Sequence, residues 1–323
     1  MTNDIHRLKQ LYYDIPQLVR RLKPDVCLTL GDLGPVSLSC RHVIFLHNSL
    51  FLYSSAELNG KAWPPVKRHY LPQHFAWSIK YAGYIVVQTS VMSERLAERY
   101  SIDPRRIIEI AQPVPDHITH SSDTIAVNPR IEIINKPVRL LFLAAYYPHK
   151  NHSVLPAVAR ELERRDLTKR VHIFTTLEDS PNEWGKIKHE LAEYSECITN
   201  LGRLLPTEVG DSLRASTALF LPTITESYGL IYLEAMACGR PILTSDRDFA
   251  RWMCQDLAIY FDPFDASSIV DAIESLLDFQ RGDDYRSRVI QRLKAFPQDW
   301  NEVAKAFDVV LCQAAEQVVG DAA

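Results

Sequence analysis

Short apolar segments alternate with longer amphipathic segments along most of this chain, and that alternation limits its fold more than any other feature. A strand that is apolar along its whole length has both faces buried, as in a parallel sheet covered by helices. In the first part of the chain we predict strands at residues 26–30, 42–46, 84–88 and 106–110. Predicted helices lie at residues 5–22, with a kink at Pro16, and at 77–82 and 91–100.

The same alternation begins again after a polar, irregular segment at residues 121–136. Here we predict strands at residues 138–144, 171–175, 218–222, 241–244 and 259–261, and helices at 152–165, 184–194, 207–214, 228–238, 266–279 and 301–319. A chain of 323 residues is long enough for two domains. The prediction is therefore an α/β protein with two doubly wound, Rossmann-like domains that face each other across a ligand cleft. The first comprises residues 1–136, including the linker 121–136, and the second comprises 137–323, with a last helix placed to pack back on the first domain.

Composition excludes several classes of protein. No apolar run approaches the ~18–20 residues of a membrane span, and the first ten residues lack the apolar region of a secretory signal. The six cysteines have neither zinc-ligand spacing nor a disulfide pattern, so we expect reduced thiols, no metal site and a cytoplasmic protein. The net charge of −4 argues against a general nucleic-acid-binding protein.

Charge is unevenly distributed along the chain. Residues 1–136 carry 16 Lys and Arg against 12 Asp and Glu, whereas the rest carries 20 against 28. No acidic residue lies between Asn59 and Ser93, where four basic residues are interleaved with aromatic ones such as Trp63, Trp77 and Tyr81. One interpretation is a face that rests on an anionic membrane surface or holds an anionic acceptor. The alternative is a solvated face whose aromatic side chains lie in the core.

Residues 219–245 carry the most informative pattern, in which a predicted strand runs through a turn into a helix. The free N–H groups of a helix start, here at residues 227–230, favour phosphate, and Gly229 lets backbone approach a ligand closely. Glu226 precedes this helix and Glu234 lies inside it, and both can accept hydrogen bonds from sugar hydroxyls. The segment therefore suits a sugar nucleotide. Otherwise Glu226 is a helix-N-terminal acid and Glu234 a surface residue.

This segment also resembles the Glu-x7-Glu signature of retaining glycosyltransferases of family 4, which have the GT-B fold. It reads Glu226-Ser-Tyr-Gly-Leu-x-x-x-Glu234-Ala-Met-Ala-Cys-Gly239-Arg-Pro241. The flanking segments 201–204, 219–222, 262–265 and 296–300 are similar to the same family. The resemblance covers residues 138–307 well and 24–115 more loosely.

The resemblance implies donor-binding roles in the second domain. Glu226 would lie beside the donor sugar, and Glu234 would hold the ribose of the nucleotide. The residues whose helix-start amides would cradle the diphosphate are Ser227, Tyr228, Gly229 and Leu230.

The resemblance also implies positive charge at the diphosphate. Lys150 matches the phosphate-binding lysine of the family. The arginine that precedes this lysine in the family is replaced by Ala144 or Ala145 here. Arg203 and His149 are the candidates to supply the missing contact.

The first domain departs from the family, whose members begin with a strand and a Gly-rich loop. This chain begins with a helical pattern, so we expect a shortened first domain in which the turn at residues 31–35 takes over part of the loop's role. His47 follows a predicted strand and resembles the family's active-site histidine, and the alternative is a packed core histidine. Asp246-Arg247-Asp248 resembles a metal-binding motif of another fold and is interpreted as a polar turn.

Together these features predict a glycosyltransferase of the hexosyltransferase type that moves a sugar from a nucleotide diphosphate sugar to an acceptor hydroxyl, in polysaccharide or glycolipid synthesis. The resemblance implies retention of anomeric configuration and a reaction without metal or cofactor. Expected partners are the donor, a sugar or lipid-linked acceptor, and an anionic membrane surface to which a cytoplasmic protein binds peripherally. Two alternatives stay open: a catalytically weak sugar-nucleotide-binding or scaffold protein, and another GT-B enzyme such as a sugar-nucleotide epimerase.

Overall fold

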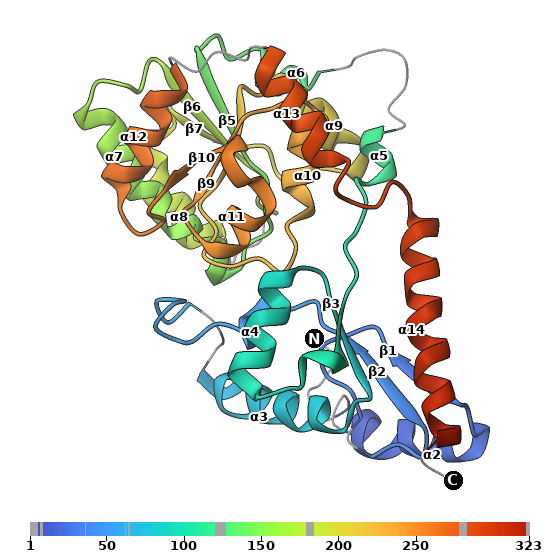
Figure 1. Cartoon of the computed structure of the whole chain (residues 1–323). Coiled ribbons are helices and arrows are strands. Elements are labelled where there is room, and N and C mark those ends of the chain that lie inside the picture. The colour runs from blue at the N-terminus through green and yellow to red at the C-terminus, as the bar shows by residue number, and fades with distance from the viewer. Residues whose placement is uncertain are drawn as a thin grey trace. The chain divides into compact units, whose positions relative to one another are not determined.

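The computed structural model describes residues 6, 9–35, 37–61, 63, 65–119, 127–178, 184–277 and 283–320. The chain forms two compact units (Figure 1). Unit 1 comprises Met1–Pro113 and Pro297–Ala323, and unit 2 comprises Val114–Phe296. Each unit contains one parallel sheet, which confirms the predicted α/β class with two sheets.

Unit 1 contains a four-stranded sheet in the order β1-β2-β3-β4. Its strands are β1 (Val26–Thr29), β2 (Arg41–Phe45), β3 (Tyr84–Val87) and β4 (Ile107–Glu109), and every neighbouring pair is parallel. The central strands β2 and β3 are buried along almost their whole length. This burial on both faces explains the apolar residues 43–45 of β2 and 84–87 of β3.

Helices from both ends of the chain complete unit 1. They are α2 (Ile15–Leu22), α3 (Pro65–Tyr81), α4 (Ser90–Tyr100) and α14 (Trp300–Gly320). Val303 and Val310 of α14 share one apolar cluster with Val43 and Phe45 of β2. The last helix therefore forms part of the core of unit 1, as the position of α14 beside β1 and β2 shows (Figure 1).

Two helices of unit 1 differ from the sequence prediction. The predicted helix at residues 5–22 is a π-helical turn at Gln10–Asp14 that continues into α2. The helix changes from π to α just before Pro16, because proline has no N–H to donate to the preceding turn. The other helix, α3, has 17 residues rather than the predicted six, and it contains Pro72. Its mixed polarity gives almost no helical periodicity, so the sequence revealed only its end.

Unit 2 contains a six-stranded parallel sheet in the order β10-β9-β8-β5-β6-β7. The strands are β5 (Val138–Phe142), β6 (Val171–Thr175), β7 (Ile198–Asn200), β8 (Ala218–Leu221), β9 (Ile242–Ser245) and β10 (Ala258–Phe261). The helices are α5 (Asp116–Thr119), α6 (Pro129–Glu132), α7 (Leu155–Arg164), α8 (Trp184–Leu191), α9 (Pro206–Ala215), α10 (Leu230–Ala237), α11 (Asp248–Cys254), α12 (Ala266–Leu277) and α13 (Asp283–Leu293). The edge strand β7 and the helices α5, α6, α11 and α13 were not predicted.

The units divide after Pro113 rather than at the predicted boundary, residue 136. Part of the predicted linker 121–136 lies outside the described residues, and the rest packs on unit 2. The Asn128 side chain donates to Ser212 Oγ of α9 at 3.0 Å, and Ile131 of α6 is fully buried. Polar residues suggested a linker at this point, but they are used in hydrogen bonds to α9.

The helices of the described ranges include none that combines the length and the apolar character needed to cross a membrane.

Candidate functional site

The loop from β8 to α10 is shaped by Gly229, which immediately precedes the helix. Its φ of 79° is left-handed, and a Cβ at this position would lie 2.6 Å from a ring carbon of Tyr232. Only glycine meets both conditions. The helix begins at Leu230, two residues later than the sequence suggested, and glycine has no side chain with which to cap its first amides. These amides and the helix dipole therefore favour an anion at the start of α10.

Glu226 and Lys150 meet beside this helix start, although 76 residues separate them in the chain. Lys150 Nζ lies 2.6 Å from Glu226 Oε1. Glu226 is 8% exposed and lies four residues before the first residue of α10, with its carboxylate paired with Lys150. The pair places one cation and one carboxylate together at the carboxyl ends of β5 and β8, where α/β sheets bind ligands.

Backbone hydrogen bonds hold Lys150 in this position. The carbonyl of His149 accepts from the Ile224 amide at 2.8 Å and from the Thr223 hydroxyl at 3.2 Å, so the loop after β5 is joined to the loop after β8. Asn151 follows with φ 64°, and its buried side chain donates to the carbonyl of Pro263 at 2.8 Å. The turn at residues 262–265, part of the family resemblance, thus anchors the lysine loop.

Glu234 lies in the second turn of α10 and is 8% exposed, so the alternative interpretation as a surface residue is wrong. Burial raises the pKa of this carboxyl to about 7. His117 of α5 places its Nε2 atom 3.4 Å from Glu234 Oε1. No pattern in the sequence pointed to His117, because the contact joins a short helix after the unit boundary to a residue more than a hundred positions away.

Arg203 lines the same pocket of unit 2 as the two alanines that replace the family's arginine. The pocket has a volume of about 430 Å³, and Arg203, Ala144 and Ala145 all line it. Arg203 Nη1 lies 3.7 Å from Glu178 Oε1, and both side chains are largely exposed. An exposed pair of this kind is weak. The Arg203 guanidinium is therefore available at the position where the family arginine is absent.

His149, the other candidate for that role, does not provide a positive charge. Burial, reinforced by the neighbouring Lys150 charge, lowers the pKa of His149 to about 4. The imidazole is neutral at pH 7. Arg203 is thus the better replacement for the missing arginine.

The remaining predicted donor-binding residues lie at the start of α10. Ser227 and Leu230 are half-buried there. The Tyr228 ring is buried and packs against the rings of Trp252 and Phe296, with centroids 6.4 Å and 6.3 Å away. Its side chain belongs to the core, so a donor contact from this residue would use its backbone.

His47 belongs to unit 1 and is exposed at the carboxyl end of β2. Its amide donates to Asp32 Oδ1 at 2.9 Å, which joins the turn at residues 31–35 to His47. Its ring centroid lies 3.9 Å from that of Phe45. Burial of part of the ring lowers the pKa of His47, against the opposing effect of the Asp32 carboxylate. The alternative of a packed core histidine is wrong, because the residue is exposed.

The Asp246-Arg247-Asp248 tripeptide uses its carboxylates within the protein. Asp246 binds the Arg251 guanidinium through two hydrogen bonds of 2.7 and 2.8 Å, and Asp248 Oδ1 accepts from the Phe249 amide. Among the residues that the structure describes, no group of three or more His, Cys, Asp and Glu is arranged to hold a metal ion.

Comparisons with known proteins identify the family and the fold that this chain resembles. The family described as "Glycosyl transferases group 1" matches residues 126–295. A D-inositol 3-phosphate glycosyltransferase of Frankia alni is 30% identical over 178 residues. That match covers 51% of this chain and 42% of the relative, so less than half of the relative's length is represented.

Solved structures show the fold. An α,α-trehalose-phosphate synthase (UDP-forming) from Burkholderia vietnamiensis superposes with a TM-score of 0.71 at 13% identity, over 93% of this chain and 74% of that one. A sucrose-phosphate synthase from Thermosynechococcus elongatus superposes with a TM-score of 0.69 at 14% identity, over 95% and 77% of the two chains. The predicted GT-B architecture is confirmed by these similarities.

Proposed function

The chain belongs to the group 1 glycosyl transferases, and we propose that it moves a sugar, a hexose by the family resemblance, from a nucleotide diphosphate sugar to an acceptor hydroxyl in polysaccharide or glycolipid synthesis. The observation that carries the proposal is the Lys150–Glu226 pair, 2.6 Å apart, beside the uncapped start of α10. A cation and free backbone amides together suit a diphosphate. A carboxylate at the same place suits the hydroxyls of the sugar attached to it.

Each site residue then has a defined task. Lys150 and the first amides of α10 stabilise the negative charge that develops on the departing diphosphate. When the diphosphate takes over the Lys150 ammonium, Glu226 is released to accept hydrogen bonds from the donor sugar. Glu234 accepts hydrogen bonds from the ribose, and Arg203 supplies the second phosphate contact. In our proposal the reaction uses these residues and needs neither a metal nor a cofactor.

We further propose that the reaction retains anomeric configuration by front-face displacement, in which the donor phosphate takes the proton of the acceptor hydroxyl. The resemblance to retaining glycosyltransferases of family 4 supports this route. His47, at the carboxyl edge of the unit 1 sheet, is proposed to hydrogen-bond the donor sugar.

The alternatives are separated by a transfer assay. The alanines at 144 and 145 favour a weakly catalytic binding protein, because they remove one phosphate charge partner. An epimerase would change the nucleotide sugar without consuming an acceptor. We would incubate the protein with a panel of nucleotide sugars and acceptors, including inositol phosphates because of the name of the relative above, and quantify nucleoside diphosphate and glycosylated product.

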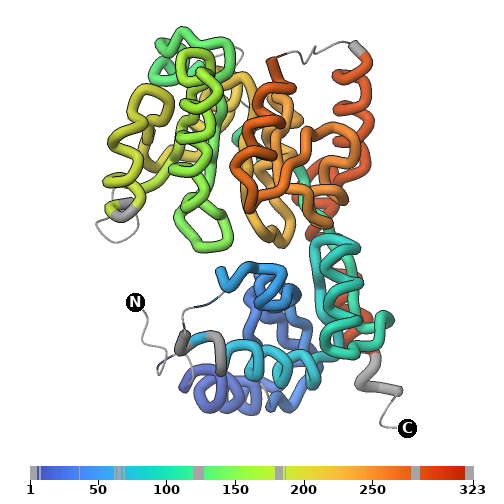
Figure 2. The backbone as a smooth tube through the Cα atoms, turned by 90° about the vertical axis from the view of Figure 1, so that its left-hand side faces the viewer, coloured from blue at the N-terminus to red at the C-terminus, as the bar shows by residue number. Residues whose placement is uncertain are grey.

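We also propose that the protein is cytoplasmic and that unit 1 binds an anionic membrane surface. Trp77 and Tyr81 are 46% and 55% exposed, so the competing interpretation, that these rings lie in the core, is wrong for both. Tyr12, next to α2, is also exposed, and its ring centroid lies 6.0 Å from that of Trp77. The π-helical turn that leads into α2 thus lies beside α3 (Figure 2). Exposed Arg20 and Arg21 of α2 add positive charge to unit 1.

Replacement of Arg20 and Arg21 by glutamate should lower binding to vesicles that contain phosphatidylglycerol by at least about tenfold, because each basic residue near an anionic bilayer contributes ~1 kcal/mol. Co-sedimentation measures this binding, which should also weaken with added salt. The matched control is Arg160→Glu with Lys169→Glu, two exposed positions of unit 2. Equal binding to neutral and anionic vesicles would contradict the proposal and leave a soluble acceptor.

A further inference from the structure

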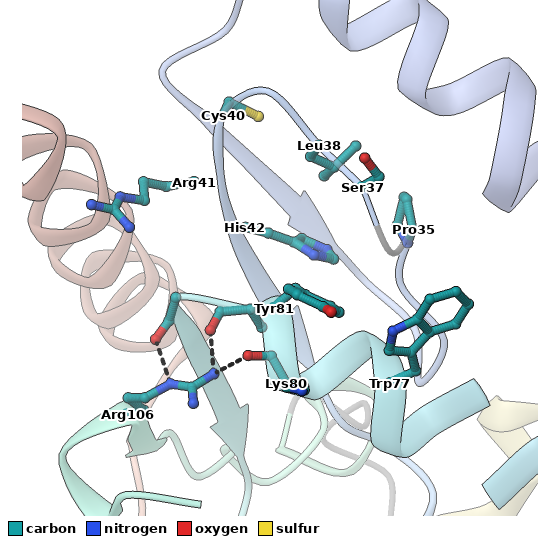
Figure 3. Close-up of a pocket in the computed structure, with 12 residues that line it drawn as sticks. Pro35, Ser37, Leu38, Cys40, Arg41, His42, Trp77, Lys80, Tyr81 and Arg106 are labelled. Carbon is teal, nitrogen blue, oxygen red and sulfur yellow. Dashed lines mark hydrogen bonds between the residues drawn. The ribbon is translucent and has the colours of Figure 1, made fainter. Parts of the chain in front are cut away.

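A second pocket lies in unit 1, at the amino end of its sheet (Figure 3). Its volume is about 720 Å³, and it is lined by the chain that leads into β2, by the first residues of β2 and by the end of α3. His47 follows the opposite, carboxyl end of β2, about 16 Å away for five strand residues. Doubly wound sheets bind their ligands at the carboxyl edge. The pocket is therefore separate from the edge that carries His47.

His42 forms the floor of this pocket. It is 3% exposed, and its ring points into the cavity (Figure 3). Nε2 lies 2.7 Å from Thr29 Oγ1, and no other hydrogen bond of the ring occurs among the described residues. Burial lowers the pKa of His42 to about 4, so the ring is neutral at pH 7. A neutral imidazole with one engaged nitrogen offers the other to a hydroxyl group.

The walls of the pocket are aromatic and apolar. Trp77 and Tyr81 lie four residues apart, on the same face of α3, and their exposed rings line the cavity opposite Pro35 and Leu38. The C–H faces of a sugar or inositol ring are apolar, whereas its rim carries hydroxyls. Aromatic walls with a single hydrogen-bonding group on the floor match that distribution.

The charge of the pocket is positive. None of its lining residues that the structure describes is an acid. Lys80 is exposed, and its ammonium lies 5.7 Å from the ring centroid of Tyr81 without an ion pair among the described residues. Arg106 donates to the carbonyls of Lys80, Ala82 and Gly83 and so fixes the end of α3 (Figure 3). Arg106 therefore fixes the backbone from which Lys80 and Tyr81 project.

We propose that this pocket binds a hydroxylated ring that carries a phosphate, either as a free sugar or inositol phosphate or as the headgroup of a lipid. The ring stacks between Trp77 and Tyr81, one hydroxyl pairs with His42, and the phosphate pairs with Lys80. This second ligand site does not depend on the proposed sugar transfer.

Cys40 allows a direct test, because it lines the pocket and is half-exposed, whereas Cys312 of α14 is exposed elsewhere. The full chain is alkylated with N-ethylmaleimide at pH 8, since burial raises the pKa of the Cys40 thiol, and each cysteine is followed by mass spectrometry. Glucose 6-phosphate and inositol 1-phosphate are the soluble probes. At least one should slow modification of Cys40 by about fivefold or more at ~10 mM, as expected for a site of millimolar affinity, and leave Cys312 unchanged. Glucose and inorganic phosphate alone should protect much less.

Variants and vesicles complete the experiment. Trp77→Ala and Lys80→Gln should each raise the probe concentration that gives half-maximal protection by about tenfold. Trp300→Ala and Lys305→Gln are matched controls, because Trp300 is 44% exposed outside the pocket and Lys305 is also exposed. Protection by vesicles of phosphatidylinositol but not phosphatidylglycerol would identify a lipid headgroup, and protection by soluble probes alone would identify a free phosphate. Failure of every probe, equal protection of Cys312, or wild-type affinity in Trp77→Ala would overturn the proposal.

Discussion

Replacing Lys150 by alanine should lower kcat/KM for sugar transfer by about 30- to 1,000-fold, which corresponds to about 2–4 kcal/mol of transition-state stabilisation. The reason is local. Lys150 is the cation that lies beside both Glu226 and the start of α10, and its side chain is largely buried. Charge on the departing diphosphate would develop next to it in a site that excludes much of the water. Rates are measured at limiting donor, where loss of this contact has its full effect.

The control for this experiment concerns folding. Lys150→Ala leaves Glu226 buried without its cation, which by itself destabilises a protein. The double variant Lys150→Ala/Glu226→Gln removes both charges and should recover stability without recovering transfer. Lys169→Ala, an exposed change in unit 2, should behave as wild type. A near-wild-type kcat/KM in Lys150→Ala would contradict the assignment of Lys150 as the phosphate-binding residue.

The two glutamates should separate nucleotide binding from sugar transfer. Glu234→Ala should weaken binding of the free nucleoside diphosphate by about tenfold or more, because a buried carboxylate would no longer accept from the ribose hydroxyls. Glu226→Ala should leave that affinity unchanged or raise it, because Glu226 no longer competes for the Lys150 ammonium. It should nevertheless impair transfer strongly. Calorimetry with the nucleotide and the transfer assay read the two effects independently.

The pH dependence gives a second readout for Glu234. Its pKa of about 7 in the free protein means that the carboxyl is largely protonated below pH 6 and ionised above pH 8. Ribose hydroxyls donate best to the ionised form, so nucleotide affinity should rise between these values. The nucleotide phosphate adds its own change in this range, so Glu234→Gln is the reference that isolates the carboxylate. Equal losses of nucleotide affinity in both glutamate variants would refute the separate roles.

The sequence was most informative where structure depends on local pattern. Strands β5, β6 and β8 were predicted because central parallel strands are buried on both faces, so that most of their residues are apolar. By contrast, β7 is a three-residue edge strand with one exposed position, and such a segment has no distinctive pattern. The start of α10 was recognised from its motif, and Gly229 proves to be sterically required there.

What the sequence did not reveal depends on tertiary contacts. The boundary at Pro113 follows from the packing of α5 and α6 on α9, which polar residues near Asn128 concealed. His117 approaches Glu234 only because α5 and α10 pack together in the folded chain. Likewise, the Tyr228 ring is buried against Phe296, which is distant in the sequence. The His42 pocket is formed by three segments of unit 1 and leaves no motif in the sequence.

The central claim is that this chain consumes a nucleotide sugar and an acceptor together. Its most direct test is the transfer assay with UDP-, GDP-, ADP- and dTDP-sugars against sugar, inositol phosphate and lipid-linked acceptors, with the anomeric configuration of the product read by NMR. We predict that at least one donor yields stoichiometric nucleoside diphosphate and a glycosylated product of the donor's own anomeric configuration, and that Lys150→Ala abolishes both. Saturable binding of a nucleotide sugar by the wild-type protein, without product from any acceptor, would contradict the claim and identify a sugar-nucleotide-binding protein.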